Sequence, residues 1–98
     1  MIKPIYAMWI LFTFLGLQNL AVNTIGVNVY PNPTNGLFTI ELNALTHIVI
    51  TNSLGQTVFN ETVNEGKQIL TLKNQESGLY FVKLNQNGKQ QTIKLIKN

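Results

Sequence analysis

Hydrophobic and polar positions alternate with a period of two along most of the chain from residue 26 onward. The segment "LFTIEL" (37–42) shows this clearly, because it places Phe38, Ile40 and Leu42 on one face of an extended chain. Six further segments alternate in the same way or are rich in β-branched residues, which favour strands. These segments are 26–30, 46–51, 56–63, 68–73, 78–84 and 91–97. The pattern therefore predicts about seven β-strands and no long amphipathic helix in this part of the chain.

Turn-forming residues separate the predicted strands. The linking segments read "PTNG", "NAL", "NSLG", "NEG", "NQESG" and "NQNGK", and asparagine occurs thirteen times in the sequence. Glycine suits turns because it tolerates positive φ, and asparagine because its side chain bonds to nearby backbone groups. Short strands with a turn about every 8–12 residues are typical of an all-β sandwich or barrel.

The N-terminal segment has a different pattern. Residues 5–17 read "IYAMWILFTFLGL", without a charge, and Lys3 precedes them. A membrane-spanning helix needs roughly 20 apolar residues, whereas a charged start and a short apolar run are typical of a secretory signal peptide. We therefore expect a signal peptide at 1–21, a short linker at 22–26 and one domain at 27–98. An uncleaved membrane anchor and a buried helix are the alternative interpretations.

The segment "VYPNPTNG" precedes the best-patterned strand. Pro31 and Pro33 fix φ at about −65° and hold the residues before them extended. Gly36 can adopt the positive φ that a turn into the next strand needs. We expect a rigid corner that limits strand pairing and carries the chain from one sheet to the other.

Residues that carry catalytic or metal chemistry are scarce. His47 is the only histidine, and the chain has no cysteine, aspartate or arginine. Ser53 and Ser77 therefore have no aspartate to complete a catalytic triad, and a lone histidine does not make an ordinary zinc site. No glycine segment resembles a phosphate-binding loop, because each lies in a β-turn context. We expect a protein that is not an enzyme and binds no cofactor or metal, with His47 as an ordinary strand residue.

The charge is weakly positive and dispersed. Seven lysines and four glutamates give a net charge of +3. Nucleic-acid-binding domains gather Lys and Arg on one face, which these positions do not suggest. We expect no nucleic-acid partner, and membrane contact only through the signal peptide.

The segment "GLYFVKL" (78–84) is apolar on both faces as far as Lys83, which predicts a central strand. Gly78 stands two residues before Tyr80, as in the tyrosine corner of sandwich domains, where the hydroxyl bonds to upstream backbone. Tyr80 is therefore interpreted as a core residue rather than a ligand-stacking aromatic.

Four motifs occur in a specific order: "VYPNPTNG", "ITNSLGQTV", "ESGLYFVKL" and, at the end, "KLIK". Together they resemble the C-terminal sorting domain, type A, of cargo proteins of the type IX secretion system. The resemblance covers residues 27–98. One position departs from the family, because Asn52 stands where an Asp-x-x-Gly turn ending at Gly55 carries aspartate. Asparagine can make the same side-chain-to-backbone bond.

The resemblance implies a small Ig-like antiparallel β-sandwich of about seven strands. Proteins with such domains are exported by Bacteroidota: the signal peptide directs them to the periplasm, and the outer-membrane translocon recognises the folded domain. A sortase-like peptidase then removes the domain and joins the cargo to an anionic lipopolysaccharide, so the protein ends at the cell surface or is secreted. The partners implied are translocon and sortase-like components. With only 22–26 between the expected signal peptide and the domain, we expect a cargo that is nearly absent.

The terminal segment, 91–98, and the strand 78–84 are the expected determinants of export. Within the terminal segment, Ile93 and Leu95 share one face and Lys94 lies on the other, so Leu95 is expected in the core. Replacing Lys94 or Lys97 is expected to leave stability nearly unchanged. We expect the terminal strand to add to the edge of a partner sheet. The candidate recognition residues are Pro31, Asn32, Pro33, Gly36, Asn52, Gly55, Gly78, Tyr80, Lys83, Lys94, Leu95, Ile96 and Lys97.

Two other functions remain open at this stage. One is a small Ig-like binding or adhesion module at the cell surface, although the turn segments 52–55, 64–66 and 85–89 offer no aromatic residue to a ligand. The other is a structural protein anchored by an uncleaved helix at 5–17.

Overall fold

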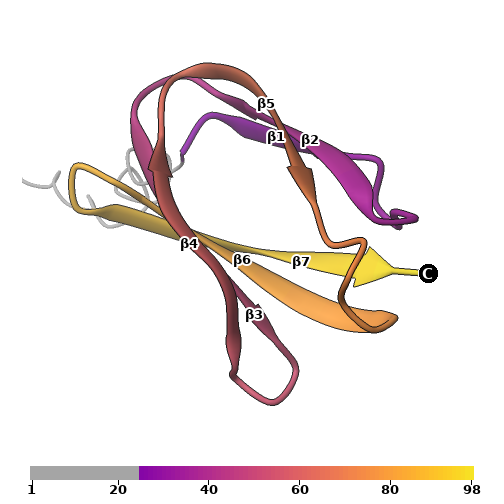
Figure 1. Cartoon of the computed structure of the whole chain (residues 1–98). Helices are drawn as coiled ribbons and strands as arrows, with labels where there is room; N and C mark the ends of the chain where they lie inside the picture. The colour runs from indigo at the N-terminus through magenta and orange to yellow at the C-terminus, as the bar shows by residue number, and fades with distance from the viewer. Residues whose placement is uncertain (1–24) are drawn as a thin grey trace, which may run out of the picture.

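The computed structural model describes residues 25–98, which form seven strands and no helix (Figure 1). The strands are β1 (Val27–Tyr30), β2 (Leu37–Leu42), β3 (Thr46–Asn52), β4 (Thr57–Val63), β5 (Gly66–Thr71), β6 (Gly78–Gln86) and β7 (Lys89–Lys97). No helix in this part of the chain is long and apolar enough to cross a membrane. The expected signal peptide lies outside the described residues.

The strands form two antiparallel sheets. The smaller sheet has the order β1-β2-β5 and the larger one β4-β3-β6-β7. Figure 1 shows the two sheets facing each other, with β6 and β7 passing below β1 and β2. The prediction of a sandwich of about seven strands is confirmed, and so is the central position of β6, which lies between β3 and β7.

The core lies between the sheets and follows the period of two. Phe38, Ile40 and Leu42 of β2 are all buried, as the alternation predicts. The buried hydrophobic residues of both sheets are Ile25, Phe38, Ile40, Leu42, Ile48, Ile50, Leu72, Tyr80, Val82, Leu84 and Leu95. Leu95 is fully buried whereas its neighbour Lys94 is exposed, so the predicted faces of the terminal strand are confirmed.

Several strand boundaries differ from the prediction, most of all in β5, β6 and β7. The strand β5 begins at Gly66 rather than at residue 68, because Gly66 still pairs with Leu42. The strands β6 and β7 extend to Gln86 and Lys89, because only Asn87 and Gly88 join them. Both linking residues have positive φ, 50° and 86°, which fits the two-residue turn that the twist of a hairpin favours.

The segment 31–36 between β1 and β2, here called the proline corner, does not carry the chain between the sheets, so that expectation is wrong. The strand β2 turns back and pairs with β1 over Val27–Tyr30 in the same sheet. The corner instead reaches the other sheet by a direct contact, a parallel bridge between Thr34 and Lys97. The strands β1 and β2 can still pair, because the six residues that link them are enough to reach β7 and return to the smaller sheet.

Candidate functional site

The proline corner and the terminal strand meet through the side chain of Asn32. Its Nδ2 donates a hydrogen bond of 2.8 Å to the backbone oxygen of Lys94. Its Oδ1 accepts one of 3.1 Å from the backbone N–H of Ile96. Because β7 is the outer strand of its sheet, these backbone groups lie on the side where a further strand would pair. A single side-chain amide thus takes the place of that strand.

Thr34 continues this contact with its backbone. Its N–H donates to the oxygen of Ile96 and its oxygen accepts from the N–H of Asn98, each over 2.8 Å. Its hydroxyl donates to the oxygen of Leu37 and accepts from the N–H of Gly36. Thr34 is fully buried, and all its polar groups are bonded. Sequence reasoning missed this residue, and the only signal for it was a hydroxyl two positions before the turn glycine.

Gly36 permits the close approach of the corner to the end of β5. Its φ is +135°, as the turn predicts, and its oxygen accepts a hydrogen bond of 2.7 Å from the N–H of Leu72. A Cβ at this position would lie 3.0 Å from Cγ of Lys73. The position therefore requires glycine for backbone and space together.

The three residues of "KLIK" other than the buried Leu95 have different environments. Lys94 is exposed and Ile96 is 47% exposed, both on the outward face of β7. Lys97 is half-buried on the other face, and its Nζ donates to the backbone oxygens of Lys73 and Gln75. The expectation that replacing Lys97 leaves stability nearly unchanged therefore does not fit its contacts.

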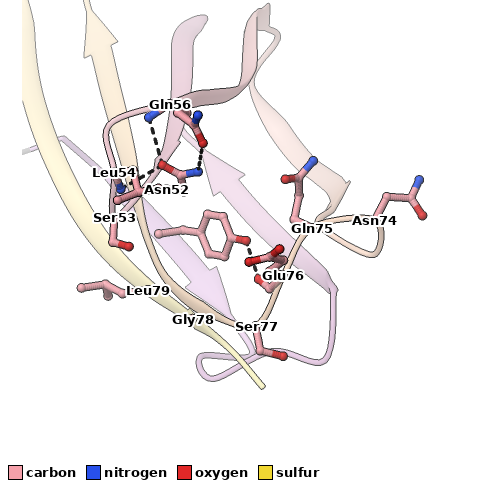
Figure 2. A pocket seen from close by; sticks show the side chains of 11 residues that line it. Asn52, Ser53, Leu54, Gln56, Asn74, Gln75, Glu76, Ser77, Gly78 and Leu79 are labelled. Carbon is pink, nitrogen blue, oxygen red and sulfur yellow. Dashed lines mark hydrogen bonds between the residues drawn. The ribbon is translucent and has the colours of Figure 1, made fainter.

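The turn after β3 is closed by Asn52. Its Oδ1 accepts hydrogen bonds from the N–H groups of Leu54 and Gln56, over 3.0 and 2.9 Å. Figure 2 shows the Asn52 side chain between these two residues, inside the turn. The N–H of Gly55 donates to the oxygen of Asn52, and Gly55 has a φ of +86°. Asn52 thus makes the side-chain-to-backbone turn bond that the sequence predicts for it.

Tyr80 is buried and its hydroxyl donates to the backbone oxygen of Glu76, which confirms the predicted tyrosine corner. Gly78 begins this strand with a φ of +147°. The segment 74–80 and the turn at Asn52 line an open, mainly polar cavity of ≈ 400 Å³ (Figure 2). This cavity lies at the end of the sheet, where β3 stops and β6 starts.

Strand register brings the motifs to the same end of the larger sheet. Asn52 lies opposite Tyr80, and Tyr80 lies opposite Leu95. Gly78 lies opposite Lys97, which bridges to the proline corner. Of the candidate recognition residues in this sheet, Lys83 lies farthest from that end, opposite Thr92 near the middle of β7. Four segments that are far apart in the sequence therefore form one continuous structure.

The family model for the secretion system C-terminal sorting domain matches residues 28–98. The chain belongs to this family, the type IX secretion sorting domains. The match includes all the motifs that meet at the end of the larger sheet. A search of curated proteins found no match. The sorting domain thus has a role in type IX secretion, which implies recognition by that machinery and export to the cell surface or beyond.

The remaining titratable groups of the sorting domain form no catalytic arrangement that we recognise. His47 lies exposed on β3, with Nδ1 2.8 Å from Oγ1 of Thr62, and no group of three metal-ligand side chains occurs in residues 25–98. The hydroxyl of Tyr30 on β1 donates a hydrogen bond to the carboxylate of Glu41 on β2. This hydrogen bond, with smaller effects of desolvation and of the carboxylate charge, raises the pKa of Tyr30 above its ordinary value of 10.0.

Proposed function

We propose that residues 27–98 are the export signal that the type IX translocon recognises in its folded form, so that an attached cargo crosses the outer membrane. The observation that carries this proposal is the bonded contact between the proline corner and the terminal strand. It joins two of the family's motifs into one structure, which an unfolded chain would not present. Recognition therefore depends on the fold.

The wider route follows from the family. A signal peptide at 1–21 takes the chain to the periplasm, and 22–26 link it to the domain. A sortase-like peptidase then releases the domain and attaches the cargo to lipopolysaccharide at the cell surface. These steps are part of the proposal, and the family match supports them only through the sorting role.

The candidate recognition residues divide into two groups by their contacts. Most of them shape the structure through buried side chains, turn geometry or hydrogen bonds. We assign that role to Pro31, Asn32, Pro33, Gly36, Asn52, Gly55, Gly78, Tyr80, Leu95 and Lys97. The exposed side chains of Lys83, Lys94 and Ile96 are left to contact the machinery directly.

The test is an export assay. Residues 26–98 are fused behind a signal peptide and a fluorescent cargo, in a host with type IX secretion and in its translocon-deficient mutant. We expect cargo at the surface or in the medium of the competent host only. Cargo held in the periplasm of both strains, with the domain folded, would contradict the proposal and favour an Ig-like binding module.

A further inference from the structure

The backbone edge of the last residues of β7 is already hydrogen-bonded within the molecule. In an antiparallel strand, successive residues direct their N–H and C=O groups to opposite sides, so Lys94, Ile96 and Asn98 direct theirs away from β6. The bonds from Asn32 use the oxygen of Lys94 and the N–H of Ile96. The bonds to Thr34 use the oxygen of Ile96 and the N–H of Asn98. A partner strand added here would have to break these four bonds.

The outward face of the same strands offers side chains instead. Because Tyr80, Val82 and Leu84 are buried between the sheets, the residues between them point away from β1, β2 and β5. Strand register places Leu79 opposite Ile96 and Phe81 opposite Lys94. We call the set Leu79, Phe81, Lys83, Lys94 and Ile96 the outward strip.

The outward strip is apolar at one end, where Leu79 lies opposite Ile96, and becomes basic towards the other, at Lys94 and Lys83. Leu79 and Phe81 are half-buried and Ile96 is 47% exposed, so the apolar part is accessible. Lys83 and Lys94 are both exposed. The strands β3, β6 and β7 contain no Asp or Glu that would neutralise them. A complementary surface would therefore have an apolar part with acidic side chains at one end of it.

We propose that the secretion machinery binds the sorting domain through the outward strip, using an acidic protein surface, while Asn32 and Thr34 occupy the backbone edge at the last residues of β7. This inference rests on the proposed export function and adds the chemistry of the partner. Anionic lipid is the less suitable occupant, because recognition of a lipid surface takes roughly four to eight clustered cations and the strip has two.

Two double charge reversals test the proposal in the export assay. We expect K83E/K94E to lower export about tenfold, because the introduced carboxylates would face an acidic surface. The matched control K73E/K89E makes the same change in net charge at exposed lysines outside the strip, and is expected to export like the wild type. Export of both variants at the wild-type level would overturn the proposal and favour strand addition, since backbone pairing does not depend on these charges. An equal loss in both would also overturn it, because net charge alone would then explain the effect.

Thermal unfolding checks that each variant is folded. If K83E/K94E does not fold, the neutral and similarly sized variant K83Q/K94Q replaces it, with a smaller loss expected and wild-type export contradicting the proposal. Failure of the wild-type domain itself to be exported would reject the proposed function, which separates the two claims.

Vesicles containing anionic phospholipid provide the last comparison. We expect no co-flotation of the purified domain with these vesicles at physiological ionic strength. Co-flotation that K83E/K94E abolishes would overturn the proposal and assign the outward strip to lipid.

Discussion

The side-chain amide of Asn32 makes two hydrogen bonds that a neighbouring strand would otherwise make with β7, one through Nδ2 and one through Oδ1. Its amide presents one donor and one acceptor, which match the alternating groups of the β7 edge. Aspartate, serine or threonine would not offer both with the same geometry, because none has a carboxamide. The value of asparagine between two prolines lies in this pairing, since the prolines restrict the backbone and the side chain stays in place.

Replacing Asn32 with alanine should lower the free energy of unfolding by about 1–2 kcal/mol, because two hydrogen bonds to backbone are lost. Urea denaturation measures this change, and the amide hydrogen of Ile96 should exchange faster. Asn35→Ala is the matched control, since the side chain of Asn35 accepts only one bond of 3.3 Å from Asn98. Equal losses in the two variants would show that the Asn32 amide has no special role.

The pKa of Tyr30 should lie above its ordinary value of 10.0, because its hydroxyl donates a hydrogen bond to Glu41. The folded state holds this proton more tightly than the unfolded state does. The stabilisation is therefore complete below the unfolded pKa and is lost as the pH rises through the folded pKa. A pH titration followed by NMR of the tyrosine ring tests this, and Glu41→Ala should return the pKa towards 10.0. An unchanged pKa in that variant would contradict the assigned cause.

The terminal strand β7 serves both the core and the surface. Leu95 is fully buried, whereas its neighbours Lys94 and Ile96 are exposed on the outward side. Its edge is bonded to the proline corner, and its other side pairs with β6 along its whole length. Changes in this strand therefore affect folding or recognition according to which face they alter.

We expect Leu95→Ala to destabilise the domain by about 2–5 kcal/mol, since it leaves a cavity between the sheets. Lys94→Ala should change stability by less than about 0.5 kcal/mol, as an exposed substitution. Lys97→Ala should cost about 1 kcal/mol, because the ammonium group loses hydrogen bonds to two backbone oxygens. Denaturant titrations of the three variants give the order, and a neutral Leu95→Ala would disprove the assignment of faces.

Taken together, the two sheets depend on residues from both ends of the described chain. Ile25 and Leu95 both belong to the core, and Thr34 bonds to Asn98. A small domain has little stability to spare, so removing either end should affect the whole fold.

Deleting Lys94–Asn98 should therefore unfold the domain rather than remove only a recognition element. Circular dichroism and proteolysis of the truncated domain measure this outcome. Loss of export in such a truncation would not by itself identify contact residues, whereas the charge reversals in the outward strip would. A truncated domain that melts like the wild type would contradict this account.

Much of the sandwich follows from local patterns in the sequence. Alternation identifies Phe38, Ile40 and Leu95 as core residues, because the strand period fixes the face of every second side chain. The turn bond of Asn52 was also predictable, since it joins residues only two and four positions apart.

The contacts of Asn32 and Thr34 with β7 were not predictable in this way. They join backbone and side-chain groups that are 62 and 64 residues apart in the case of Asn32, and such bonds leave no periodic trace. Lys97 was placed correctly in a strand, but its bonds depend on where the loop after β5 runs. The sequence therefore did not predict polar contacts between residues that are far apart along the chain.

The closed edge of β7 also bears on self-association. An open strand edge presents unpaired donors and acceptors that can template the addition of another copy of the chain. In this molecule one carboxamide and one short backbone bridge occupy those groups at the end of β7. Loosening the corner would free these donors and acceptors for pairing with another copy, so the Asn32 contact removes one possible site of self-association.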